Sequence, residues 1–114
     1  MRMFDTGATR DADTTKIDPE GFLSPQVIQY YCEYMHKNRI QADGQLRASD
    51  NWQRGIPRDA YMKSAWRHFL EWWWLHRTAG SSVIARRNAL CALWFNVMGY
   101  LYEDGRAESA DESY

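Results

Sequence analysis

The segment KSAWRHFLEWWWLHR, residues 63–77, places basic and acidic side chains among four tryptophans and a phenylalanine. Arg67 and His68 are adjacent, and Glu71 follows three residues after His68. Residues three or four apart share one face of a helix, so Glu71 is within reach of both. One interpretation is a surface ion pair. The other is a catalytic site beside Trp72, in which Glu71 and His68 act on a substrate, Glu71 binds a divalent metal or water, and His68 and Arg67 contact phosphate.

Start and stop signals along the chain predict three helices that position these residues. Ser24 suits an N-cap before a proline, Pro57 suits the first position of a helix, and Gly105 suits a helix end. The expected helices span residues 25–38, residues 57–77, and a third segment from Ser81 or Ser82 to Glu103. The sequence therefore predicts an all-α fold, a small bundle of three main helices.

A chain of 114 residues has room for a single domain, which we expect over residues 1–114. Residues 1–23 are predicted to form an extended arm, residues 24–103 the helical core, and residues 104–114 an acidic, flexible tail. Residues 39–56 form a loop of unusual length, and such loops are often functional. Five large apolar residues are expected to pin the arm onto the body: Met3, Phe4, Ile17, Phe22 and Leu23.

The expected helix over residues 57–77 is apolar on two of its three sides. A surface helix of a monomer needs only about a third of its circumference to be apolar. This helix is therefore predicted to be central or to lie in the interface of a homo-oligomer.

Small residues follow one another at helical spacing along the third expected helix, with Asn96 as the one polar group among them. Such a stripe permits close packing of a neighbouring helix, or close approach of a flat ligand to the backbone. The stripe consists of Ala85, Ala89, Ala92, Asn96 and Gly99.

The net charge is −1, but acidic residues gather at the two ends and leave the middle of the chain basic. A basic middle favours an anionic partner, although ordinary solvated helix faces explain it equally. Cys32 and Cys91 stand in apolar surroundings and are predicted to be buried free thiols of a reducing cytosol. The chain has no zinc spacing, no glycine-rich phosphate loop, no strongly basic recognition helix and no membrane-length apolar run. Sequence-specific DNA binding and membrane insertion are not expected.

Several motifs, taken in order, resemble those of the phage-borne family of dATP/dGTP diphosphohydrolase N-terminal domains. They are TGATRD, GFLSP, EYMHKNR, QADG, SDNWQRGIP, MKSAWRHF and ALCALWFNVMGYL, and together they cover nearly the whole chain. The resemblance implies a relative of the all-α nucleoside triphosphate pyrophosphohydrolases. It further implies hydrolysis of dATP or dGTP to the monophosphate and pyrophosphate with Mg or Mn, in the cytoplasm of an infected bacterium.

Enzymes of that group hold their metals with a Glu-Glu-x-x-Glu pattern on one helix and Glu-x-x-Asp on the next, and this chain has neither pattern. Two function classes therefore stay open. The first is a metal-dependent pyrophosphohydrolase with Glu33 and Glu71 as metal ligands, completed by carboxylates of a second chain. The second is a non-catalytic phage protein that sequesters a purine nucleotide or nucleotide-type signal, or that binds a host protein. A helical dimer with a role in assembly alone is a third option.

Both main classes lead to the same expected ligand, a purine nucleotide, and to one set of contacts. The long loop supplies polar groups through its SDNW and RGIP motifs, and a tryptophan stacks on the base. The predicted nucleotide-binding residues are Asn51, Trp52, Arg54, Arg67, Trp72, Asn96 and Lys37.

Overall fold

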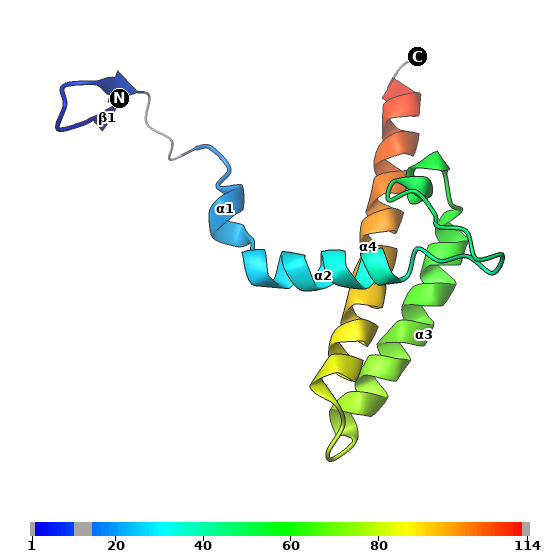
Figure 1. Ribbon diagram of the computed structural model, residues 1–114. Coiled ribbons are helices and arrows are strands. Elements are labelled where there is room, and N and C mark those ends of the chain that lie inside the picture. Colours follow the sequence, from blue (N-terminus) through cyan, green and yellow to red (C-terminus); the bar gives the residue numbers. More distant parts are fainter. Residues whose placement is uncertain (1, 11–14, 113–114) are drawn as a thin grey trace.

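The computed structural model describes residues 2–10 and 15–112, and its fold is all-α apart from one short β-ribbon, as the sequence predicted (Figure 1). The predictions of an arm and a tail at residues 1, 11–14 and 113–114 concern positions outside the described residues. In chain order the elements are β1 (Arg2–Met3), β2 (Thr9–Arg10), α1 (Pro19–Phe22), α2 (Pro25–Lys37), the 3-10 helix η1 (Asn51–Arg54), α3 (Arg58–Arg77) and α4 (Val83–Glu112).

The helix starts follow the local capping chemistry. The Ser24 hydroxyl accepts a hydrogen bond from the Val27 backbone N–H at 3.2 Å, which caps α2. Ser82 directly precedes α4, and its hydroxyl accepts a hydrogen bond from the Ala85 N–H in the first turn of that helix at 3.2 Å. Pro57 is the N-cap of α3, so that helix begins one residue later than predicted.

The core lies between α3 and α4, which run side by side and are joined by a short connection (Figure 1). The stripe of small residues on α4 faces α3, so close helix packing is what this stripe provides. Gly99 makes the closest approach, since a Cβ there would overlap the ring of the buried Tyr61. The buried residues among those described are Tyr61, Ala89, Cys91, Ala92, Asn96 and Gly99.

The predicted end of the last helix was wrong, because α4 continues past Glu103 to Glu112. Gly105 does not adopt the positive φ that ends a helix, and its surroundings are open. Tertiary contacts hold this stretch instead: Arg58 forms an ion pair with Asp104 at 2.6 Å, and Arg106 donates to the Gln53 carbonyl at 3.4 Å and to Glu103 at 3.2 Å. Residues 104–112 are therefore helical, although residues 105–109 are exposed, as expected for the acidic tail.

The prediction that the arm is pinned to the body was also wrong. The arm projects away from the helices (Figure 1), and its apolar side chains are exposed, including Ile17 at 82% and Phe22 at 81%. Its backbone groups bond locally: the Phe4 N–H donates to the Ala8 carbonyl at 2.9 Å around Gly7, and Asp18 caps α1. Local hydrogen bonds therefore shape the described part of the arm, which projects away from α3 and α4.

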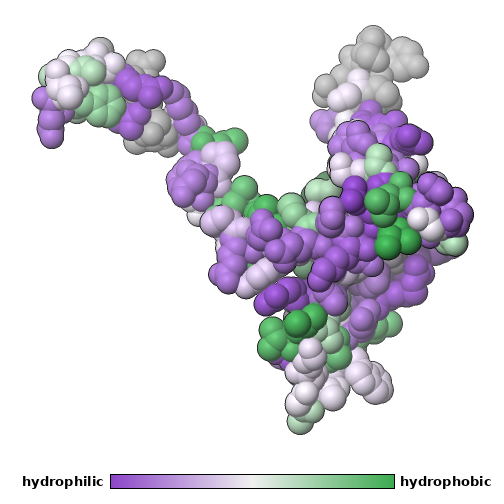
Figure 2. Space-filling view, viewed as in Figure 1, coloured by the Kyte–Doolittle hydropathy of each residue, from purple (hydrophilic) through white to green (hydrophobic). Residues whose placement is uncertain are grey.

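Helix α2 crosses one side of the α3–α4 hairpin. Tyr31 packs on Trp94 with ring centroids 4.7 Å apart, and the Arg87 guanidinium lies 3.7 Å from the centroid of the Tyr30 ring. Seen from the viewpoint of Figure 2, α2 is largely hydrophilic, and hydrophobic residues gather at the α1–α2 junction and at the lower end of the hairpin. Within the described residues, no helix combines the length and apolar character needed to cross a bilayer.

Candidate functional site

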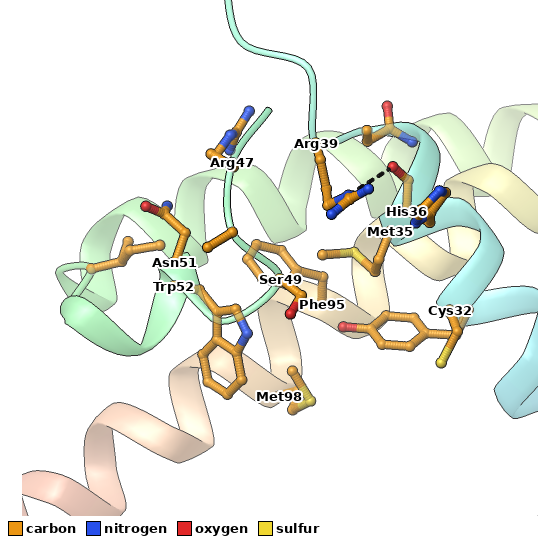
Figure 3. A pocket seen from close by; sticks show the side chains of 14 residues that line it. Cys32, Met35, His36, Arg39, Arg47, Ser49, Asn51, Trp52, Phe95 and Met98 are labelled. Carbon is orange, nitrogen blue, oxygen red and sulfur yellow. Dashed lines mark hydrogen bonds between the residues drawn. The ribbon is translucent and has the colours of Figure 1, made fainter. Parts of the chain in front are cut away.

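A cavity of about 420 Å³ lies where the C-terminal half of α2, the loop after it and the middle of α4 meet (Figure 3). This volume is within the range of small-molecule sites. In the close-up, Arg39 and Arg47 lie at one side of the cavity, and Trp52, Phe95 and Met98 form the other. The lining residues are Tyr31, Cys32, Met35, His36, Asn38, Arg39, Arg47, Ala48, Ser49, Asn51, Trp52, Ile56, Phe95 and Met98.

A small hairpin in the loop brings the two arginines of the cavity together. Gly44 has φ 82°, which allows a tight turn, and Ile40 and Leu46 form an antiparallel bridge on either side of it. The Arg47 N–H then donates to the Arg39 carbonyl at 2.7 Å. Arg39 and Arg47 thus occupy opposite positions on the two short strands of this hairpin. Like charges in such positions disfavour each other.

The charged groups of the cavity are basic. The Arg39 Nε donates to the His36 carbonyl at 3.4 Å, and neither arginine has a carboxylate partner among the residues that the structure describes. Among the described residues, the Arg47 side chain has no hydrogen-bond partner. No aspartate or glutamate lines the cavity. The cavity therefore favours an anionic group, and guanidinium forks match the geometry of phosphate.

The opposite wall is aromatic and is anchored to α4. Trp52, in η1, meets Tyr102 edge-on with ring centroids 4.7 Å apart. The Ile56 N–H donates to Glu103 at 3.3 Å, which fixes the end of the loop. Because one edge of Trp52 is held in this way, the ring forms a firm wall on which a flat group can stack.

Tyr31 adds a neutral hydroxyl to the same cavity. Burial raises the pKa of Tyr31 to about 12, with smaller contributions from Cys32, Cys91 and Tyr61. A raised tyrosine pKa favours the protonated form. At neutral pH the side chain is therefore an uncharged hydrogen-bond donor and does not repel an anion.

Two of the predicted nucleotide-binding residues, Asn51 and Trp52, line the cavity. Arg54 and Lys37 are exposed and do not line the cavity. Each of them follows lining residues of its own helix, Arg54 in η1 and Lys37 in α2. Arg67 is exposed on α3, and Trp72 stacks on His76 with ring centroids 6.0 Å apart. These two residues and the cavity do not form one site.

Asn96 is buried at 4% exposure, and its side-chain amide donates to the Ala92 carbonyl of its own helix at 2.8 Å. It belongs to the packed contact between α3 and α4 and is not among the residues that line the cavity. The bond to Ala92 gives this buried amide a partner within α4 itself.

The candidate catalytic and metal-binding residues also lie apart from the cavity. His68 Nδ1 and Glu71 Oε2 are 3.4 Å apart, a half-exposed pair of the surface type, and Glu33 accepts from the Gln29 amide at 3.1 Å. Neither carboxylate lines the cavity. Across the described residues, no three His, Cys, Asp or Glu side chains come together in a way that would hold a metal ion.

Sequence reasoning missed the two arginines that dominate the cavity, together with His36 and the α4 residues Phe95 and Met98. A local signal for the arginines was present. The Asp-Gly pair at residues 43–44 is flanked by Ile40 and Leu46 at hairpin spacing, so Arg39 and Arg47 fall opposite each other.

Comparison with family models, curated proteins and solved structures gives no match. The resemblance to the phage diphosphohydrolase family stays a prediction.

The two cysteines differ, which corrects the expectation that both are buried. Cys32 is exposed on the cavity side of α2, whereas Cys91 is buried. Burial raises the pKa of the Cys91 thiol, against a smaller opposite effect of Arg87, so less thiolate forms at a given pH.

We expect the Cys91→Ser protein, which keeps Cys32, to react faster with a disulfide reagent than the Cys32→Ser protein. Equal rates in the folded state would contradict this, and equal rates in urea serve as the control.

Proposed function

We propose that this protein binds a purine nucleotide in the cavity between α2, the loop and α4, and holds it without hydrolysis. Arg39 and Arg47 bind the phosphates, and the base stacks on the Trp52 side of the cavity. The observation that carries the proposal is the pair of adjacent arginines without carboxylate partners, opposite an anchored aromatic ring.

The size and composition of the cavity support this ligand class. A volume of about 420 Å³ suits a small ligand of this kind. A nucleotide needs a cationic group for the phosphates and an apolar face for the base, and the two sides of the cavity supply them separately. The resemblance of the sequence to a dATP/dGTP diphosphohydrolase family leads to the same ligand.

The absence of carboxylates from the cavity lining is the reason to propose binding without hydrolysis. Pyrophosphohydrolysis with Mg or Mn needs clustered carboxylates to hold cations that bridge the triphosphate. Glu33 and Glu71, the two acids predicted for this role, bond to Gln29 and His68 away from the lining. In this proposal Arg39 and Arg47, and not carboxylate-bound metal cations, neutralise the charge of the phosphates.

Titration calorimetry with dGTP and dATP, in a chelator and at fixed salt concentration, tests the proposal. We expect saturable binding without metal, because the arginines neutralise the phosphates directly. Parallel samples without chelator, incubated with Mn and separated by ion-exchange chromatography, should contain intact triphosphate.

The Glu71→Gln protein is the matched control and should bind like the wild type. Monophosphate and pyrophosphate released by the wild type, and not by Glu71→Gln, would overturn the proposal in favour of the hydrolase. If neither nucleotide binds, with or without Mn, a purine nucleotide is not the ligand of this protein.

A further inference from the structure

Two charged side chains near the end of α4 hold the loop segment that carries Trp52. The Glu103 carboxylate accepts a hydrogen bond from the Ile56 N–H at 3.3 Å, and the Arg106 guanidinium donates to the Gln53 carbonyl at 3.4 Å. The two side chains also pair with each other at 3.2 Å. We call Glu103 and Arg106 the α4 clamp. Neither of them lines the cavity.

The segment that the clamp holds has little structure of its own. The helix η1 has a single turn, and Asp50 at its N-cap makes no capping bond with its side chain. Two backbone bonds shape the turn: the Gln53 N–H donates to the Asp50 carbonyl at 2.9 Å, and the Gly55 N–H donates to the Trp52 carbonyl at 3.3 Å. A 3-10 turn of this length is marginal in isolation, because its hydrogen bonds are few and poorly aligned. The segment therefore depends on α4 for its position.

Gly55 allows the backbone to meet both members of the clamp. It lies between the Gln53 carbonyl and the Ile56 N–H, and its φ of 119° is one that side chains rarely adopt. A Cβ at Gly55 would lie 3.5 Å from Arg106 Nη1. The guanidinium therefore lies directly against this turn of the loop.

The two members of the clamp act differently. The Glu103 side chain is 16% exposed and the Arg106 side chain is 46% exposed. A half-exposed ion pair contributes little, whereas a largely buried carboxylate that accepts from a backbone N–H forms a charge-assisted bond. The Arg106 guanidinium also lies 5.7 Å from the centroid of the Tyr102 ring, which in turn meets Trp52 edge-on. Glu103 therefore anchors the backbone, and Arg106 supports the aromatic contact.

We propose that the α4 clamp positions the aromatic wall of the cavity for its ligand, so that Glu103 and Arg106 are positioning residues for binding. This inference rests on the nucleotide binding proposed above, and it adds the end of α4 to the elements that control affinity. Trp52 and Ile56 line the cavity, and both belong to the segment that the clamp holds. A wall that is fixed before the ligand arrives avoids the entropy cost of ordering it on binding.

Hydrogen exchange of the ligand-free protein, followed by NMR, tests whether the clamp holds the segment. Replacing Glu103 with alanine removes the acceptor of the Ile56 N–H, so this amide should exchange about tenfold faster or more. The amides of Ala89 and Ala92, buried in the middle of α4, should change much less and serve as the internal control. Unchanged exchange at Ile56 would overturn the proposal, whether or not a nucleotide binds.

Titration calorimetry with two ligands tests whether this positioning matters for binding. Inorganic pyrophosphate offers phosphate to the arginines of the cavity but no base to Trp52. In Glu103→Ala the affinity for dGTP should fall by about tenfold, whereas the affinity for pyrophosphate should stay within about twofold. Equal losses for both ligands would indicate a damaged fold, and they would overturn the proposal, as would an unchanged affinity for dGTP.

The failure of this inference can be told apart from the failure of the proposed function. A wild-type protein that binds neither ligand would overturn nucleotide binding, and this inference with it, even if the Ile56 amide responds as expected. A wild type that binds dGTP, with Glu103→Ala unchanged in affinity, would overturn the positioning role alone.

Two further variants give the matched comparison. Glu103→Gln keeps an oxygen that accepts from the Ile56 N–H, so it should recover most of the dGTP affinity that Glu103→Ala loses. Asp104→Ala removes the neighbouring carboxylate, which pairs with Arg58 of α3 at 2.6 Å, and its dGTP affinity should stay within about twofold of the wild type. An equal loss in Asp104→Ala and Glu103→Ala, or no recovery in Glu103→Gln, would contradict the proposal.

Arg106→Ala tests the second member of the clamp. It changes a half-exposed side chain, so the circular dichroism spectrum should be that of the wild type. We expect the dGTP affinity to fall by about threefold and the pyrophosphate affinity to stay unchanged. A folded Arg106→Ala protein with wild-type affinity for dGTP would overturn the assignment of Arg106 as a positioning residue.

Discussion

Replacing Gly99 with alanine is expected to destabilise the protein, and replacing Gly105 with alanine is expected to stabilise it. Both glycines lie within α4, where alanine has the higher helix propensity by about 1 kcal/mol. A Cβ at Gly99 would overlap the Tyr61 ring, whereas a Cβ at Gly105 meets nothing within 4 Å. Overpacking of a core costs about 1–3 kcal/mol, which outweighs the gain in propensity at Gly99.

Urea unfolding followed by circular dichroism, at one fixed protein concentration, measures both changes. We expect the free energy of unfolding to fall by up to about 2 kcal/mol in Gly99→Ala and to rise by about 0.5–1 kcal/mol in Gly105→Ala. Combining Gly99→Ala with Tyr61→Leu should cost less than the sum of the two single changes, because the smaller side chain removes the overlap. A stabilised Gly99→Ala protein would show that α3 and α4 pack less closely than the structure has them.

Replacing both Arg39 and Arg47 with alanine is expected to weaken nucleotide binding by at least about a hundredfold. A hydrogen bond to a charged group contributes about 1.5–3 kcal/mol, and each 1.4 kcal/mol is a factor of ten in affinity. Each arginine alone should therefore cost about tenfold or more. The affinity of the double variant should also depend less on salt, since two charge contacts are lost.

Titration calorimetry at two salt concentrations measures these changes, and Arg67→Ala is the matched control. Arg67 is an exposed arginine on α3 that does not line the cavity, so its removal should leave the affinity within about twofold. An equal loss in Arg67→Ala and in Arg39→Ala would show nonspecific attraction to the basic surface. A larger loss in Arg67→Ala would favour a site at the sequence-predicted position on α3.

Features fixed by local chemistry could be predicted from the sequence. Ser24 and Ser82 cap their helices by accepting a hydrogen bond from a backbone N–H three residues later. Such a bond depends only on residues that are close in the sequence, so the sequence can predict it. The stripe of small residues that ends at Gly99 predicted close approach of either a neighbouring helix or a flat ligand, and in the structure it is Tyr61 of α3 that lies against Gly99. Gly105 misled the prediction, because the contacts of Asp104 and Arg106 with residues far away in the chain keep α4 intact beyond it.

The candidate site could be predicted only in part. Asn51 and Trp52 were found because they lie in a long loop with turn signals, and such loops gather function. Periodicity cannot show which side of α3 another helix covers, so His68 and Glu71 looked as suitable as the residues that do form the cavity. The Arg39–Arg47 pair depends on a backbone bridge, and Phe95 and Met98 join it from a helix some fifty residues later.

The position of α4 in the chain has a consequence for synthesis on the ribosome. The α3–α4 hairpin has a short connection, so it can form once α4 has emerged. The α2 helix and its loop emerge earlier, before Phe95 and Met98 exist to pack against them. The side chains of Tyr31, Met35 and Trp52 therefore stay exposed to solvent until α4 has been synthesised. The cavity forms last, when α2 and its loop pack against α4.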